Sequence, residues 1–200
     1  MLRRALVTSL VLTALAAVGL GLVYPFAVYA IGQVAFPHRA DGSLVTRGGV
    51  TVGSSLIGQS FTDARGDPLP QYFQSRPSLA GAGYDATSSG ASNLGPGDPR
   101  LLQAVAQRVA AYRKLNGLAP GTPVPVDAVT ASASGLDPEI SVANADLQAP
   151  RVAAARHLPL AMVLGCVRSH TEKRPLGFLG EAGVNVLELN LALDQLAKRA

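Results

Sequence analysis

The chain has 200 residues, of which 48% are hydrophobic and only 15% are charged. This balance excludes an intrinsically disordered chain, and the single cysteine excludes an internal disulfide framework and a Cys-rich zinc site. The formal net charge is +4, and because the sequence shows no basic cluster or aromatic platform, we expect no nucleic-acid partner.

Residues 5–31 form an apolar segment that predicts a transmembrane helix, since no Asp, Glu, Lys or Arg lies between Arg4 and Arg39. A helix over this range is ~40 Å long, enough to cross a ~30 Å hydrocarbon core with tilt. Pro25 is expected to kink this helix or to end its first stretch. A signal peptide cleaved after Ala30 is the alternative, but signal peptides have a shorter apolar core of ~7–15 residues.

Arg3 and Arg4 predict the orientation of the chain, because positive charges next to a span remain in the cytoplasm. Residues 1–4 are therefore expected inside the cell. Residues 37–200 are expected to form one exported domain, on the periplasmic or extracytoplasmic side of the inner (plasma) membrane. If cleavage occurred after Ala30, the same domain would be a free extracellular binding protein.

The exported part begins with a hairpin signal and continues into a loop. Two short strand-like runs, Ser43–Arg47 and Val50–Val52, flank Gly48 and Gly49, which accept the positive φ of a tight turn. Residues 75–97 are rich in Gly, Ser, Pro and Ala, which is typical of a flexible linker. Tyr84 and Leu94 punctuate this stretch, so we favour an ordered loop that follows the surface.

Helix signals dominate the rest of the chain. Asp98 and Pro99 predict a helix start, and Gly117 predicts its end. Asp137 and Pro138 repeat the start signal, and a further helix is expected over residues 159–169. A strand at 184–186 should lead into a final helix. The predicted fold class is α+β: a single N-terminal transmembrane helix followed by one small exported α+β domain.

Catalytic motifs are weak in this sequence. The best hydrolase candidates are Ser132 and Ser134, with His157 and either Asp127 or Asp137 completing a triad, although neither serine lies in a GxSxG motif. The structural interpretation is that both hydroxyls line a tight turn and cap a helix that starts near Asp137.

The other reactive side chains also favour structural interpretations. The three histidines (His38, His157 and His170) are expected at the surface, and Cys166 is expected to be a small buried apolar residue. Glu188, Asn190 and Asp194 are expected at the surface or in an interface.

Motifs over nearly the whole chain resemble the KdpC family, the C subunit of the bacterial high-affinity Kdp potassium-transporting ATPase. The most specific are TASASGLDP at residues 130–138 and VNVLELNLALD at residues 184–194. The other matching segments are Tyr24-Pro25, Gly32-Gln33, Gly53–Phe61, Tyr72-Phe73, Arg76–Ser78, Ser92–Pro96, Pro150–Val152 and Ala155-Arg156.

The resemblance implies a non-catalytic accessory subunit of a potassium uptake pump. Its implied partners are a potassium-channel-like subunit, a P-type ATP-hydrolysing subunit and a small membrane peptide. The family is also described as a catalytic chaperone that assists assembly and raises the ATP affinity of the ATPase subunit. Because the bilayer separates the exported domain from cytoplasmic ATP, we expect any such coupling to pass through the membrane helix. The alternative function is a membrane-anchored periplasmic serine hydrolase.

We expect no cofactor or metal bound directly to this chain, with ATP and potassium handled by the complex. Glycines permit close helix approach, and small loop residues permit close backbone contact. The candidate subunit-interface residues are Gly19, Gly21, Tyr24, Pro25, Gln33, Ser92, Asn93, Ser132, Ser134, Asp137, Asn185, Glu188 and Asn190.

Overall fold

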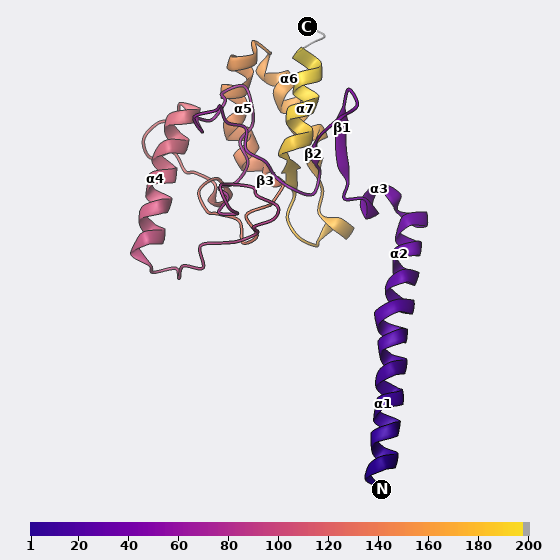
Figure 1. Ribbon diagram of the computed structural model, residues 1–200. Helices are drawn as coiled ribbons and strands as arrows, with labels where there is room; N and C mark the ends of the chain where they lie inside the picture. Colours follow the sequence, from indigo (N-terminus) through magenta and orange to yellow (C-terminus); the bar gives the residue numbers. More distant parts are fainter. Residues whose placement is uncertain (198–200) are drawn as a thin grey trace. The chain divides into compact units, whose positions relative to one another are not determined.

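One long helix dominates the N-terminal part of the chain in the computed structural model, which describes residues 1–197 (Figure 1). It comprises α1 (Leu2–Val18), a π-helical turn η1 (Gly19–Val23) and α2 (Tyr24–Ala35). Together these pieces span 34 residues, are long and apolar enough to cross a membrane, and bury none of their side chains within the chain.

The predicted break at Pro25 takes the form of the π turn, not of a helix end. Proline has no N–H to donate to the carbonyl four residues earlier, and its ring crowds that carbonyl. The wider turn at Gly19–Val23 ends two residues before Pro25, and the helix continues beyond the proline. A short helix, α3 (Pro37–Ala40), follows, and the Gln33 side chain donates a 3.0 Å hydrogen bond to the Asp41 carboxylate.

The predicted hairpin is confirmed. Strands β1 (Leu44–Arg47) and β2 (Val50–Ser54) form a two-stranded sheet, and the turn residues Gly48 and Gly49 both have positive φ. The chain divides near this hairpin into a helical unit, residues 1–51, and a globular unit that begins at Val52.

Within the described residues, the globular unit combines a small antiparallel sheet with four α-helices. The sheet has the order β3-β5-β4, formed by β3 (Glu139–Ser141), β5 (Gly183–Asn185) and β4 (Thr171–Glu172). The helices are α4 (Pro99–Asn116), α5 (Val142–Arg156), α6 (Leu160–Ser169) and α7 (Val186–Ala197). Short 3₁₀ turns occur at η2 (Val126–Ala128) and η3 (Pro175–Gly177). Together with the N-terminal helix, this arrangement confirms the predicted α+β class.

The core of the globular unit lies where α5, α6 and α7 pack against one another and the sheet (Figure 1). Apolar spacing along α5 buries Ala145, Ala149 and Val152, which meet Val163 of α6 and Leu189 of α7. The small residues of α5 allow α6 to approach closely. Cys166 is half-buried against this core, and burial raises the pKa of its thiol.

Three predicted helices are present, and one predicted helix start is wrong. The Asp98 carboxylate accepts from the Arg100 backbone N–H at 2.8 Å, and Gly117 ends α4 in the left-handed conformation, as predicted. The helix expected at Asp137-Pro138 starts at Val142 instead, because residues 139–141 pair with β5 and the Ser141 hydroxyl caps the Asn144 N–H at 3.1 Å.

Candidate functional site

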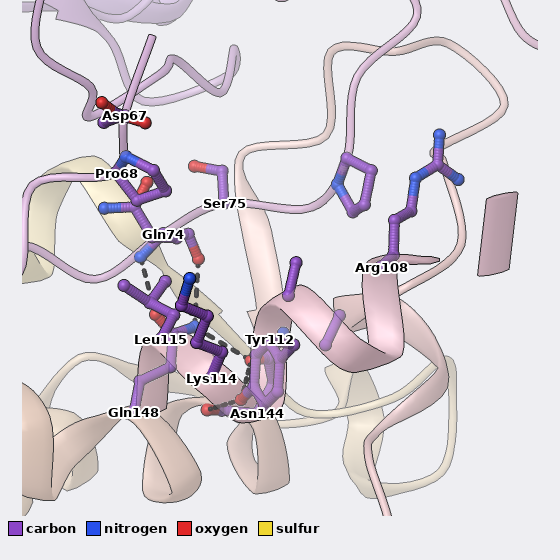
Figure 2. Close-up of a pocket in the computed structure, with 13 residues that line it drawn as sticks. Asp67, Pro68, Gln74, Ser75, Arg108, Tyr112, Lys114, Leu115, Asn144 and Gln148 are labelled. Carbon is purple, nitrogen blue, oxygen red and sulfur yellow. Dashed lines mark hydrogen bonds between the residues drawn. The ribbon is translucent and has the colours of Figure 1, made fainter. Parts of the chain in front are cut away.

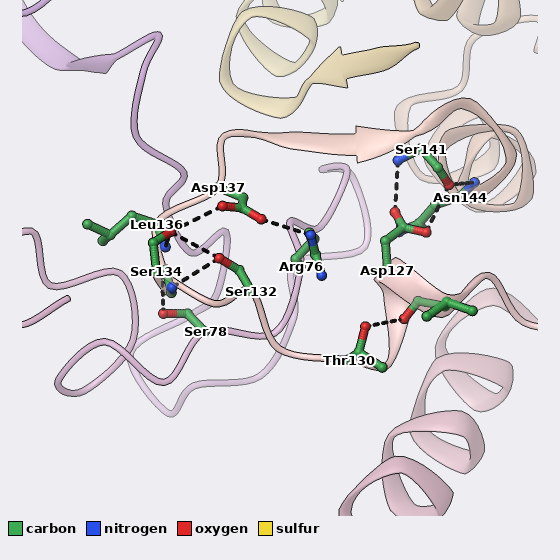
Figure 3. A network of polar contacts seen from close by, with 12 residues as sticks. Arg76, Ser78, Asp127, Thr130, Ser132, Ser134, Leu136, Asp137, Ser141 and Asn144 are labelled. Carbon is green, nitrogen blue, oxygen red and sulfur yellow. Dashed lines mark hydrogen bonds and ion pairs between the residues drawn. The ribbon is translucent and has the colours of Figure 1, made fainter. Parts of the chain in front are cut away.

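Ser132, Ser134 and Asp137 lie together in one tight loop, as the sequence suggested (Figure 3). The Ser134 hydroxyl donates to the Asp137 carboxylate at 3.1 Å and lies 3.1 Å from the Ser132 hydroxyl. The Asp137 carboxylate also forms a 2.8 Å ion pair with the Arg76 guanidinium. The loop at residues 130–138 is thereby joined to the loop at 75–97.

Hydrogen bonds to backbone groups also hold the same two loops together. The Ser78 hydroxyl donates to the Gly135 carbonyl at 2.6 Å and accepts from the Tyr84 N–H at 2.8 Å. The Gly90 N–H donates to the Ser134 carbonyl at 2.9 Å. The Tyr84 hydroxyl donates to the Arg76 carbonyl, and burial raises the pKa of Tyr84 to about 12. These contacts agree with an ordered loop over residues 75–97 and not with a linker.

Glycine is required at position 135 of this loop. Gly135 has a φ of +72°, and a Cβ there would lie 2.8 Å from the Ala80 Cβ and 2.9 Å from the Gly90 carbonyl oxygen. Both the backbone conformation and the space therefore favour glycine. We call residues 76–90 and 130–138 together the serine-loop cluster.

The serine hydroxyls are engaged in holding this turn. The Ser132 side chain is only 1% exposed, and its oxygen accepts from the Gly135 N–H at 3.0 Å. The Ser134 oxygen accepts from the Leu136 N–H at 3.0 Å. His157 is exposed at the C-terminal end of α5, and among residues 1–197 no hydrogen bond joins a histidine to either serine. The turn interpretation is confirmed, but the helix that the serines were expected to cap does not start at Asp137.

A second polar arrangement holds the irregular segment at residues 70–74, which begins in a turn closed by a 3.2 Å hydrogen bond from the Tyr72 N–H to the Leu69 carbonyl. The Asn190 amide accepts from the Phe73 N–H at 2.9 Å and donates to the Phe73 carbonyl at 3.0 Å. The Gln148 amide does the same for Gln74, at 2.8 Å and 3.1 Å. Phe73 and Gln74 lie outside any strand, so each side-chain amide supplies the hydrogen-bond partners that a neighbouring strand would otherwise provide.

Two arginines complete the contacts of this segment. Arg151 donates to the Pro70 carbonyl at 2.6 Å and the Tyr72 carbonyl at 3.0 Å, and burial lowers its pKa to about 10. Arg156 donates to the Gln71 carbonyl at 2.6 Å and lies 4.9 Å from the centre of the Tyr72 ring. It also pairs with Asp194 at 2.9 Å. We call residues 70–74 the bracketed segment.

A cavity of about 680 Å³ lies beside the bracketed segment, between it, α4 and the start of α5 (Figure 2). The Tyr112 hydroxyl donates to the Asn144 side-chain oxygen at 2.8 Å at its base. Burial, with a smaller contribution from the Asp127 carboxylate, raises the pKa of Tyr112 well above its ordinary value. Arg108 and Lys114 line the cavity with Asp67. The polar groups at its base form hydrogen bonds with one another, so these residues do not indicate a particular ligand.

The remaining predicted interface residues divide into exposed and buried groups. Glu188, Ser92 and Asn93 are exposed. Asn185 is buried, donates to the Ser55 carbonyl at 2.8 Å and accepts from the Glu188 N–H at 3.1 Å. The expected surface position of Asn190 is wrong, because its side chain is 1% exposed and serves the bracketed segment.

The candidate membrane-spanning helix carries its predicted interface residues on an exposed surface. Within the described helical unit, residues 1–51, a Cβ at Gly19 or Gly21 would have open space around it. A shallow hollow on the helix is lined by Gly21, Leu22, Pro25, Phe26 and Tyr29. Gly19 and Tyr24 lie outside this lining.

Comparison with known proteins gives the family. The family described as "KdpC: K+-transporting ATPase, c chain" matches residues 6–195. The chain belongs to the KdpC family. A potassium-transporting ATPase KdpC subunit of Mycobacterium bovis (strain BCG / Pasteur 1173P2) is 54% identical over 195 residues, covering 98% of this chain and all of the relative. The KdpC subunit of Kineococcus radiotolerans is 55% identical over 190 residues, covering 95% of this chain and 93% of the relative.

Several residues that organise this KdpC-family fold were given no structural role from the sequence. Arg151 and Arg156 lie on α5, and Gln148 lies among small apolar residues of the same helix. A buried amide or arginine within an apolar helix face is a signal that a backbone segment needs partners there. Asp127 was considered only as a possible triad member, and no local signal indicated its structural role, in which its carboxylate accepts from the Ser141 N–H and hydroxyl, each at 2.8 Å.

Proposed function

We propose that this chain is a non-catalytic accessory subunit of an ATP-driven potassium uptake pump. The observation that carries the proposal is the family match over residues 6–195, which includes both the membrane helix and the globular unit. The partners proposed are a potassium-channel-like subunit, a P-type ATPase subunit and a small membrane peptide, and the pump supplies the sites for ATP and potassium.

The membrane helix is the proposed attachment to the channel-like subunit. None of its apolar side chains is buried within the described residues 1–197, so we expect lipid or other subunits to cover them. The hollow at Gly21, Pro25 and Tyr29 offers a place where a neighbouring helix can approach closely. The adjacent π turn gives this stretch a backbone geometry that can differ between pump states.

The proposed orientation places residues 1–4 in the cytoplasm and residues 37–200 outside, because Arg3 and Arg4 precede the span. In this orientation the globular unit covers the outer entrance of the channel-like subunit. The subunit supports assembly and raises the ATP affinity of the ATPase subunit through helix packing, because a bilayer separates the globular unit from ATP.

A matched pair of substitutions tests the helix attachment. Gly21→Leu fills the hollow, whereas Gly19→Leu adds the same side chain outside its lining. We expect Gly21→Leu to raise the KM for ATP of the purified pump and to slow potassium-limited growth, with Gly19→Leu close to the parent. Equal behaviour of the two variants would reject the hollow as the attachment.

Deleting residues 37–200 while keeping the membrane helix tests the role of the globular unit. We expect potassium uptake to lose its high affinity even where the truncated chain remains in the membrane. Unchanged uptake and affinity would reject the covering role.

A further inference from the structure

The loop between β4 and β5 presents apolar side chains to solvent. Every residue from 172 to 181 is exposed. Within the loop, Leu176 is 81% exposed, Phe178 is 70% exposed and Leu179 is 47% exposed. We call residues 173–181 the apolar loop. Large apolar side chains gathered at the tip of one loop mark an interaction surface, unlike single apolar residues scattered over a protein.

Local contacts hold the apolar loop in this shape. The 3₁₀ turn at Pro175–Gly177 is closed by a 3.0 Å hydrogen bond from the Gly177 N–H to the Arg174 carbonyl. Arg174 pairs with Glu181 across the base of the loop. Leu176 has a φ of +54°, a conformation that is unfavourable for a residue with a branched side chain. The exposed position of the Leu176 side chain is therefore fixed by the conformation of the turn.

The composition and size of the apolar loop favour a lipid surface over a protein partner. A typical protein interface involves about 20–30 residues on each side, far more than the tip of this loop offers. A few apolar side chains beside a cation are enough to enter the interfacial region of a bilayer. Lys173 forms no ion pair within residues 1–197, and Arg174 is neutralised by Glu181, so the charges next to the tip do not oppose insertion.

The chain itself brings the apolar loop to a membrane. The spanning helix ends at Ala35 and the globular unit begins at Val52, so the connection is at most ~60 Å even if fully extended. A tether of this length keeps the loop at a high effective concentration near the bilayer. Even weak insertion then becomes significant.

We propose that the apolar loop inserts Leu176, Phe178 and Leu179 into the interfacial region of the bilayer that the chain's own helix spans, with Lys173 at the phospholipid headgroups. This second membrane contact restricts the tilt and rotation of the globular unit. It requires only the membrane anchor and does not depend on the identity of the pump subunits.

The absence of tryptophan from the sequence allows a direct test. The full chain with Phe178→Trp is reconstituted into vesicles of phosphatidylcholine and phosphatidylglycerol, with or without bromine on the acyl chains near the headgroups. We expect the brominated lipid to remove most of the fluorescence of this tryptophan. Leu179→Trp serves as a second reporter in the same loop, and circular dichroism verifies that both variants fold.

Leu102→Trp, at an exposed position of α4 away from the loop, is the matched control and should keep its fluorescence. Quenching at position 178 no greater than at position 102 would overturn the proposal. It would also be overturned if the emission at position 178 shifted only after the other pump subunits were added and remained insensitive to bromine, since the loop would then bind protein.

Discussion

The helical unit and the globular unit distribute their apolar and polar side chains in opposite ways. Along Leu2–Ala35 the apolar side chains are exposed and none is buried. The globular unit instead buries polar side chains, among them Ser132, Gln148 and Asn190, next to an apolar core.

This contrast shows where each unit obtains its stability. The helical unit satisfies its backbone hydrogen bonds within the helix and leaves its apolar side chains exposed, where the proposed function has lipid and partner subunits cover them. The globular unit has only short strands, so much of its irregular backbone relies on buried side chains for hydrogen bonds. Substitutions of these side chains should therefore act on folding, while substitutions on the helix should act on assembly.

The largest effect on folding is expected at Asn190. Asn190→Ala leaves the buried N–H and carbonyl of Phe73 without partners, and because each such group costs ~1–3 kcal/mol, the free energy of unfolding should fall by about 2–5 kcal/mol. Gln195→Ala, at an exposed site on the same helix, should change it little. Urea unfolding of the full chain in detergent, followed by circular dichroism, measures both. A similar unfolding midpoint for the two variants would contradict the claim that Asn190 stabilises the bracketed segment.

Gly135→Ala is expected to have the next largest effect. The new Cβ meets Ala80 and the Gly90 carbonyl at a positive φ, so a loss of about 2–4 kcal/mol is expected from strain and overpacking together. Gly121→Ala is the matched control, because Gly121 also has positive φ but has open space around its Cβ position. The difference between their unfolding midpoints isolates the contribution of crowding. Equal losses of stability in the two variants would show that the serine-loop cluster rearranges to make room for the new Cβ at position 135.

Ser132→Ala tests whether this serine is structural. The buried Gly135 N–H loses its acceptor, so we expect a loss of about 1–3 kcal/mol in the free energy of unfolding. The exposed Ser88→Ala serves as the comparison. Ester hydrolysis by the parent chain that disappears in a fully folded Ser132→Ala variant would instead support the hydrolase alternative.

The smallest effect is expected at Glu139 and depends on pH. Burial, with Glu172 and Asp137 nearby, raises the pKa of the Glu139 carboxyl above its ordinary value. The folded state therefore favours the protonated form, and the stability from this group falls as pH rises past its unfolded pKa of about 4.3. Glu139→Gln should match the parent at acidic pH and exceed its stability at pH 7 by about 0.5 kcal/mol or less. Unfolding midpoints at the two pH values measure this, and a difference independent of pH would contradict it.

Elements with local signals were predictable from the sequence, and those that depend on distant partners were not. The helix at Pro99–Asn116 carries its own cap at Asp98 and its own stop at Gly117, so its ends could be read locally. The strand at 139–141 exists because residues 183–185 pair with it. The local helix-start signal at Asp137 therefore gave a wrong prediction. The role of Asn190 depends on Phe73, which is 117 positions away along the chain.

The candidate site shows the same division. Ser132, Ser134 and Asp137 belong to one short motif, residues 130–138, so the sequence alone predicted that they lie close together. The structure confirms this with hydrogen bonds among their side chains. Their contacts with Arg76 and Ser78 depend on a loop whose composition alone favoured a linker. The sequence also placed the membrane helix, but only the structure shows that the irregularity near Pro25 is a π turn.

Co-purification tests the central claim most directly. A C-terminally tagged chain, expressed with its neighbouring genes under potassium limitation, is solubilised in mild detergent, captured and analysed by mass spectrometry. The proposed function predicts that a large multi-span channel-like protein and a P-type ATPase elute with it. Elution of the chain alone, with both of those proteins present in the same membranes, would contradict its role as a pump subunit.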